Sequence, residues 1–239
     1  RYRGASPKNY VTFNNEVWRI LGVFPTDDGT GKIENRIKLI RNESIGNYFW
    51  NTTEVASTSS YNNWTRATLK VKLNGTYLYG LTSEAQNMIG NAKYYLGGYY
   101  NIPNTQKDTM YQYERKIKNT KGNEFYFGTN PNSWTGKLAL MYASDYGYAA
   151  SEECTENLYY YNNATCKNNN WLLNSVSQWT LSQVAGGDGT ALYVTSSGPV
   201  YDNRVNSLKN GVRPVLYLTS SVQITGGSGT SSDPYTLGL

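Results

Sequence analysis

The side chains that could carry chemistry in this sequence are carboxylates, because the chain contains 17 Asp and Glu residues and no histidine. Histidine is the usual general base and proton shuttle near neutral pH, so a catalytic triad is not expected. Two carboxylates across a cleft could hydrolyse a glycoside. The sequence places no two of them across a cleft, and we do not predict an enzyme. The candidates are Glu114, Asp145, Glu152, Glu153 and Asp202.

Two aspartate-containing segments could offer oxygen ligands to a cation. They are Asp27-Asp28-Gly29-Thr30-Gly31 and Asp188-Gly189, and neither has the regular spacing of a calcium loop. Two cysteines without histidine also fall short of the four ligands of a structural zinc site. We therefore predict no metal and no cofactor.

The two cysteines, Cys154 and Cys166, lie in polar stretches on either side of three consecutive tyrosines. A disulfide between them would close a short surface loop and contribute about 3 kcal/mol to stability. Such a bond requires an oxidising compartment, which indicates a secreted or surface-displayed protein. Two unrelated free thiols are the alternative.

The composition favours a polar surface with little charge. Hydrophobic residues make up 38% and charged residues 16% of the chain, and there are 23 tyrosines against five phenylalanines. Both percentages lie below the usual globular values. A tyrosine offers a flat apolar ring and a hydroxyl, which suits partly solvated recognition contacts. Tyrosine is also frequent on the strands of any polar β-rich protein.

The net charge of +5 does not indicate a nucleic-acid-binding protein, because the basic residues are scattered and form no stripe interleaved with aromatics. No window approaches the roughly 20 apolar residues that cross a bilayer. We expect no membrane segment and no anchor within this chain.

Strands at both ends with helices between them predict an α+β fold. Residues 10–40 are typical of a three-stranded meander, whose first turn is Asn14-Asn15, since paired asparagines tolerate the positive φ of a tight hairpin. Residues 134–237 have the pattern of short strands and long loops. We expect the N- and C-terminal strands to pair within one domain that spans residues 1–239.

Two helices are predicted in the middle part, residues 64–97. Thr65 can cap a short helix that runs through Leu73 and stops at Asn74-Gly75. Ser83 and Gln86 form a capping box for a second helix, whose apolar face extends to Leu96.

Three blocks near the C-terminus carry a resemblance to a known fold. They are Trp179-Thr180-Leu181-Ser182, the segment from Val194 to Val200, and Gly211-Val212-Arg213-Pro214-Val215-Leu216. They resemble the end of C-type-lectin-like domains of the formylglycine-generating-enzyme type and of diversity-generating-retroelement target proteins. Over nearly its whole length, the chain is also similar to uncharacterised, pilin-like surface proteins of Gram-positive gut bacteria. Members of that group often carry a type IV prepilin-like N-terminal segment, which this resemblance would lead us to expect to be missing here.

The resemblance implies a fold in which the termini meet in a small antiparallel sheet and long loops form a variable surface. In retroelement target proteins the diversified positions precede the Gly-Val-Arg-Pro strand, which corresponds here to residues 188–206. A solvated loop without a role is the alternative. The implied ligand-binding residues are Tyr193, Ser196, Ser197, Tyr201, Asp202, Asn203, Arg204 and Asn206.

The sequence departs from the active members of this fold. The final strands lack the active-site cysteines of sulfatase-activating enzymes, and no Glu-Pro-Asn or Gln-Pro-Asp tripeptide of calcium-dependent lectins occurs. We therefore expect a cell-surface recognition or adhesion module that binds a protein or glycan ligand through loops rich in Tyr, Asn and Ser. A structural subunit that self-assembles into a pilus or surface layer is the alternative, and a carbohydrate-active enzyme is a distant third.

Overall fold

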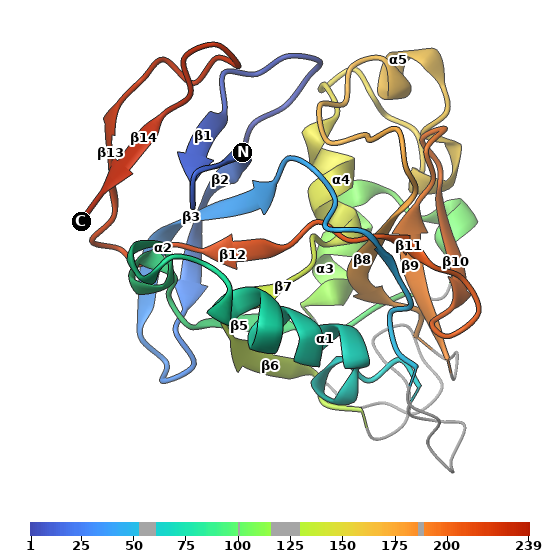
Figure 1. Ribbon diagram of the computed structural model, residues 1–239. Helices are drawn as coiled ribbons and strands as arrows, with labels where there is room; N and C mark the ends of the chain where they lie inside the picture. The colour runs from blue at the N-terminus through green and yellow to red at the C-terminus, as the bar shows by residue number, and fades with distance from the viewer. Residues whose placement is uncertain (53–60, 100, 116–129, 186–188) are drawn as a thin grey trace.

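The computed structural model describes residues 1–52, 61–99, 101–115, 130–185 and 189–239 (Figure 1). It confirms the α+β class: most elements are strands in several small, largely antiparallel sheets, accompanied by a few short helices. The described residues contain no helix that is long and apolar enough to cross a membrane.

The first sheet joins segments that are far apart in the sequence. Its strand order is β1-β2-β3-β12-β7, and all neighbouring strands are antiparallel. The strand β12, from the C-terminal part of the chain, thus lies between the N-terminal meander and β7, which agrees with the expected pairing of N- and C-terminal strands. The strands are β1 (Tyr10–Phe13), β2 (Glu16–Asp27), β3 (Ile33–Arg41), β7 (Leu138–Ala139) and β12 (Val215–Tyr217).

The turn between β1 and β2 forms as the sequence predicts. Asn14 and Asn15 have φ values of 54° and 57°, which is the left-handed conformation that a two-residue hairpin requires. The Asn14 side chain also accepts a hydrogen bond from the backbone N–H of Thr82, so the turn is tied to the start of a helix.

A hairpin of β13 (Gln223–Gly226) and β14 (Thr236–Gly238) follows the first sheet and lies beside β1 (Figure 1). The link is Tyr235, whose N–H donates to the carbonyl of Tyr10 and whose carbonyl accepts from the N–H of Thr12, both at 2.9 Å. The last segment of the chain therefore pairs with the first strand, in a parallel bridge and not an antiparallel one.

The second sheet has the strand order β10-β9-β8-β11-β4. Among the described strands of this sheet, β11 and β8 pair in parallel and the other neighbours are antiparallel. The strands are β4 (Asn47–Tyr48), β8 (Gln178–Gln183), β9 (Thr190–Val194), β10 (Val200–Arg204) and β11 (Asn210–Gly211).

The closing segment from Gly211 to Leu218 is split between the two sheets. β11 belongs to the second sheet and β12 to the first, and the chain crosses between them at Arg213 and Pro214. Proline has no N–H for a ladder. The buried Arg213 guanidinium instead donates to the carbonyls of Arg41 and Leu172 at 2.8 and 3.2 Å, which holds the crossing in place.

The predicted helix from Ser83 to Leu96 is wrong in its second half. The helix α2 (Ser83–Met88) is capped by Thr82, and residues after it form β5 (Ala92–Tyr95), which pairs with β6 (Ser133–Gly136). The helix ends before Gly90, because the backbone of Ile89 is already extended, with φ −86° and ψ 117°. A Cβ on Gly90 would lie 2.6 Å from the end of the Arg36 side chain.

The other predicted helix starts differently and continues further. Asn63 rather than Thr65 caps a 3-10 turn, Trp64–Arg66, which precedes α1 (Thr68–Lys72). Helical turns continue through Leu73–Tyr77, but Gly75 has a non-helical backbone (φ −110°, ψ −108°), so the chain kinks at the predicted stop. The Asn74 side-chain amide pairs with both backbone groups of Leu138. The other α-helices of the described chain are α3 (Lys107–Glu114), α4 (Ala143–Ala149) and α5 (Ala164–Lys167), and short 3-10 turns occur at Ile102–Asn104 and Leu158–Tyr160.

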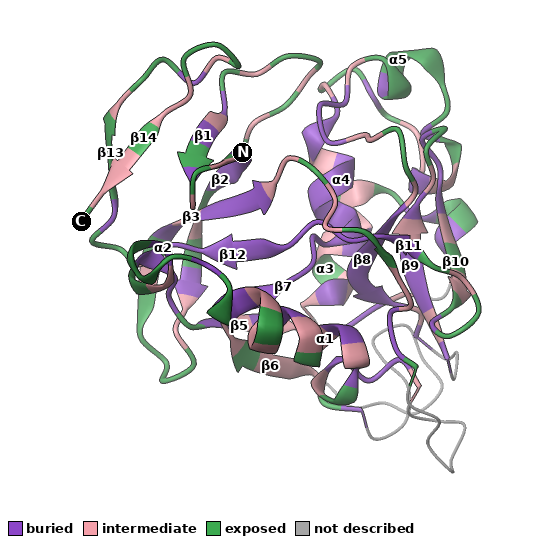
Figure 2. Cartoon of the chain, in the orientation of Figure 1, coloured by how far each residue is buried: buried purple, intermediate pink, exposed green. Residues whose placement is uncertain are grey.

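The hydrophobic core consists of two clusters, one on each face of the first sheet. Adjacent residues of one strand enter different clusters: Leu216 packs in one and Val215 in the other. The same alternation holds for Leu39 and Ile40 on β3. A sheet covered on both faces requires apolar residues at consecutive positions, which explains the short apolar runs in these strands. Figure 2 shows that β8, β12, most of α4 and the second half of β3 are buried.

The predicted disulfide is confirmed. Cys154 and Cys166 are bonded, and both are fully buried in the second cluster. The bond closes the loop that carries Tyr159 and Tyr160. A disulfide is compatible with an extracellular location.

Candidate functional site

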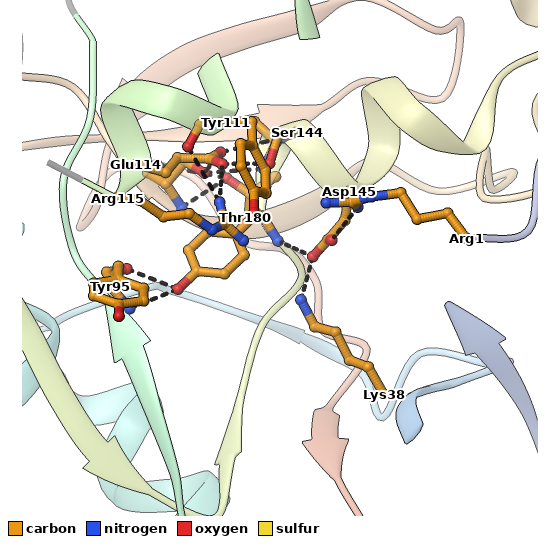
Figure 3. A network of polar contacts seen from close by, with 12 residues as sticks. Arg1, Lys38, Tyr95, Tyr111, Glu114, Arg115, Ser144, Asp145 and Thr180 are labelled. Atoms are coloured by element: carbon orange, nitrogen blue, oxygen red, sulfur yellow. Dashed lines mark hydrogen bonds and ion pairs between the residues drawn. The ribbon is translucent and has the colours of Figure 1, made fainter. Parts of the chain in front are cut away.

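A buried polar network surrounds the start of α4 (Figure 3). The first N–H groups of a helix have no partner within the helix itself. Here three side chains satisfy them: Asp145 accepts from the N–H of Tyr142, Ser182 from Ala143, and Glu114 from Ser144, at 2.9 to 3.1 Å. Two of these acceptors are carboxylates, which the helix N-terminus favours.

Asp145 lies between two cations. One carboxylate oxygen contacts the Lys38 ammonium at 2.5 Å, and the other contacts the Arg1 guanidinium at 3.2 Å. Burial by itself would raise the pKa of this carboxyl, but the charges of Lys38 and Arg1 outweigh it and lower the pKa. Asp145 is therefore ionised at neutral pH and pairs with Lys38, whose side chain is also buried.

For Glu114 the effect of burial on the pKa outweighs that of the neighbouring cation and hydrogen-bond donors. Its side chain is fully buried, and burial raises its pKa despite the nearby Arg115 guanidinium and the hydroxyls of Ser144 and Ser182. Among the described residues its cationic partner is Arg115, 3.4 Å away. Neither Glu114 nor Asp145 is exposed, so the two carboxylates that the fold brings to the same helix end do not face solvent.

Tyr142 and Arg115 connect this network to the surface. The Tyr142 hydroxyl accepts from the N–H of Tyr95 at 2.7 Å and donates to its carbonyl at 2.9 Å, which ties α4 to β5. The Arg115 guanidinium lies 3.6 Å from the ring centroid of Tyr111 and 4.8 Å from that of Tyr142. Burial raises the pKa of Tyr142 well above its ordinary value, so the hydroxyl keeps its proton.

Above the network lies a pocket of about 180 Å³, which we call the aromatic pocket. It lies where the end of β2, the strand β5, the end of α3 and the strand β12 meet. Its polar groups include the charged side chains of Asp27, Lys93 and Arg115. The aromatic residues that line it are Phe24, Tyr95, Tyr111, Tyr142 and Tyr217.

The aromatic pocket contains one ion pair and one further cation, whose carboxyl neighbour has a raised pKa. Lys93 lies 3.8 Å from Asp27. Arg115 is held by the carbonyl of Tyr111 and faces Glu114, whose raised pKa disfavours the anionic form. A half-buried guanidinium among aromatic rings can donate hydrogen bonds to oxygen-rich ligands.

The structure divides the predicted ligand-binding residues between two faces and a turn. Tyr193 and Tyr201 are directly paired across β9 and β10, and their rings are 6.4 Å apart. Strand alternation places Asp202 and Arg204 on the opposite face of the hairpin. Asn203 is on the tyrosine face and is half-buried, whereas Ser196, Ser197 and Asn206 are exposed in the turn and beyond β10.

The two paired tyrosines belong to a longer row of aromatic rings. Trp179 contacts Tyr193, and Tyr159 contacts Tyr201 with ring centroids 4.9 Å apart. Tyr159 comes from the disulfide-closed loop, so the loop and the β9–β10 hairpin share one partly exposed surface. Asp188, the start of the predicted variable segment, is outside the described residues.

The other candidate carboxylates lie at the surface. Glu152 pairs with Arg3 at 2.7 Å, and Glu153 and Asp202 are exposed. In the β2–β3 turn, Asp27 accepts from the N–H groups of Gly29 and Gly31. These oxygens thus close the turn, and among the described residues no three Cys, Asp or Glu side chains are grouped to hold a metal ion.

The sequence analysis missed the aromatic pocket. Arg115 does not stand out in the sequence, because the residues that line the pocket with it are spread between Phe24 and Tyr217. The tyrosine excess was the only signal of such a site in the sequence.

Comparison of this chain with protein-family models, with curated proteins and with solved structures finds no match. The C-type-lectin-like assignment therefore stays a prediction.

Proposed function

We propose that this protein is an extracellular recognition module that binds a glycan, with one sugar unit in the aromatic pocket. The observation that carries the proposal is the half-buried Arg115, stacked on Tyr111 and Tyr142 and opening into a pocket with five aromatic rings. Ligand sites are typically concave, with apolar and aromatic walls and a few fixed polar groups. The buried network fixes Tyr142 before any ligand arrives, which reduces the entropy lost on binding.

The C-type-lectin-like fold is part of this proposal. Its support is the contact between the two chain ends and the resemblance of the closing segments. The partly exposed tyrosines of the β9–β10 hairpin offer a second surface for a protein or glycan ligand.

The test compares a pocket variant with a hairpin variant. The wild-type protein is screened on a glycan array, and hits are measured by calorimetry. Arg115→Lys keeps the charge beside Glu114 but removes the planar donor fork, and we expect about tenfold weaker binding. The Tyr193→Ala/Tyr201→Ala double variant should bind as tightly as the wild type. Binding lost only in the hairpin variant would move the site to the hairpin, and no glycan binding at all would refute the proposal.

Self-association is the second candidate, and a specific observation favours it. Val23 and Ile33, at the meander, and Ile224, on β13, are 58%, 67% and 45% exposed. Val23 and Ile224 line the same surface hollow. Exposed apolar patches often mark interfaces. Sedimentation analysis over a concentration series would show larger species that disappear in Val23→Ser/Ile224→Ser.

A further inference from the structure

A second hollow, which we call the lysine cleft, lies between β4, α1 and the segment before β11, and it shares no lining residue with the aromatic pocket. Its volume is about 410 Å³. Leu69, almost fully buried, lines it together with the rings of Tyr48 and Phe49. Much of the wall is therefore apolar, although the cleft is open to solvent.

Two lysines also line the cleft: Lys72 is the last residue of α1, and Lys209 directly precedes β11. The Lys72 ammonium lies 4.6 Å from the ring centroid of Tyr48, and the Lys209 ammonium lies 5.1 Å from that of Phe49. Aromatic faces attract cations and so hold both ammonium groups near the apolar wall. Within the described part of the chain, neither lysine forms an ion pair, and no Asp or Glu lines the cleft.

We propose that the lysine cleft binds a carboxylate-bearing small molecule with a planar apolar body. The two ammonium groups have hydrogen-bond donors to offer, and no carboxylate among the described residues receives them, so charge complementarity selects an anion. The buried Leu69 and the threonine side chains of Thr52 and Thr68 provide contact area for the body of the ligand. The volume is within the range of sites that take small ligands.

The arrangement also favours an anion over a neutral molecule of the same shape. A neutral ligand would displace water from both ammonium groups without replacing its hydrogen bonds, which costs free energy. A carboxylate replaces those bonds with stronger, charge-assisted ones. Binding should therefore weaken as the ionic strength rises.

The experiment uses isophthalate as the probe and its uncharged diamide, isophthalamide, as the matched neutral compound. Binding to the full chain is followed by calorimetry and by NMR shifts. We expect saturable binding of isophthalate, little or none of isophthalamide, and about tenfold weaker isophthalate binding in each of Lys72→Gln and Lys209→Gln.

Lys70→Gln is the control, because Lys70 belongs to the same helix but lies near Trp134 and does not line the cleft. It should bind like the wild type, and so should Arg115→Lys, which separates this site from the aromatic pocket. Absence of saturable isophthalate binding, equal binding of the neutral diamide, or an equal loss in Lys70→Gln would overturn the proposal.

Discussion

At the scale of single residues, two buried carboxylates at one helix end show opposite responses to burial. Asp145 has two cations within 3.2 Å, and its pKa is lowered. Glu114 has hydroxyl and amide donors and one cation at 3.4 Å, and burial raises its pKa. Both residue types look alike in the sequence. The number and distance of the cationic neighbours, which come from remote segments, decide the direction of each shift.

The raised pKa of Glu114 predicts a pH dependence of stability. Below the ordinary glutamate pKa of about 4.3, the carboxyl is protonated in both states and its stabilising effect is complete. As the pH rises through the raised pKa, the unfolded chain loses the proton first, so stability falls. Asp145 acts in the opposite sense: its contribution is complete above about pH 3.9 and is lost as the pH falls through its lowered pKa.

Urea unfolding of the wild type and of Glu114→Gln at a series of pH values measures this effect. The glutamine is isosteric, and the two serine hydroxyls can reorient to accept from its amide. As the pH rises above the ordinary glutamate pKa of about 4.3, the free energy of unfolding should fall more steeply in the wild type than in the variant. Glu152→Gln, at an exposed position, should keep the wild-type slope. Identical slopes in wild type and Glu114→Gln would show that Glu114 does not titrate in this way.

At the scale of elements, most helices and strands here are too short to be stable alone, and their partners decide their form. Residues 92–95 satisfy both a helical pattern and an alternating one. Ala92 and Tyr94 are fully buried while Lys93 and Tyr95 are not, because β6 pairs with this segment as a strand. Isolated helices of this length are marginal in water, so tertiary pairing outweighs the intrinsic preference.

The β1–β2 turn is different, because its conformation depends on the two residues themselves. Asn15 has a φ of 57° and is exposed. Asn15→Gly should leave the free energy of unfolding unchanged or slightly higher, since Asn-Gly is the preferred sequence of this turn. Asn15→Val should lower it by about 1–2 kcal/mol, because a β-branched residue is strained in the left-handed conformation. Chemical denaturation of the two variants checks this, and equal stability would contradict the assigned turn.

At the scale of the whole molecule, the first sheet joins two hydrophobic clusters and the two ends of the chain. The strand β12 belongs to both clusters, since it contributes Leu216 to one and Val215 to the other. The disulfide holds the second cluster to the loop beside the β9–β10 hairpin. A destabilising substitution in either cluster should therefore lower the free energy of unfolding of the whole domain.

We predict that Leu216→Ala lowers the free energy of unfolding by about 2–5 kcal/mol, because it leaves a cavity in the first cluster. Val215→Ala, with fewer methyl groups removed, should cost less. In both variants, tryptophan fluorescence and near-UV circular dichroism should report one coincident unfolding transition, since both clusters share β12. Two separate transitions in either variant would show that the clusters unfold independently.

The sequence by itself determined the features that depend on neighbouring residues or on composition: the Asn14-Asn15 turn, the Cys154–Cys166 disulfide, the α+β class and the strands β1 to β3. Only the tertiary structure decided the split of the closing strand at Pro214, the strand at residues 92–95, and the aromatic pocket around Arg115. Local patterns fix backbone conformations that a few residues can specify. Strand pairing, burial and pKa shifts depend on contacts between segments that are distant in the sequence. No local pattern encodes those contacts.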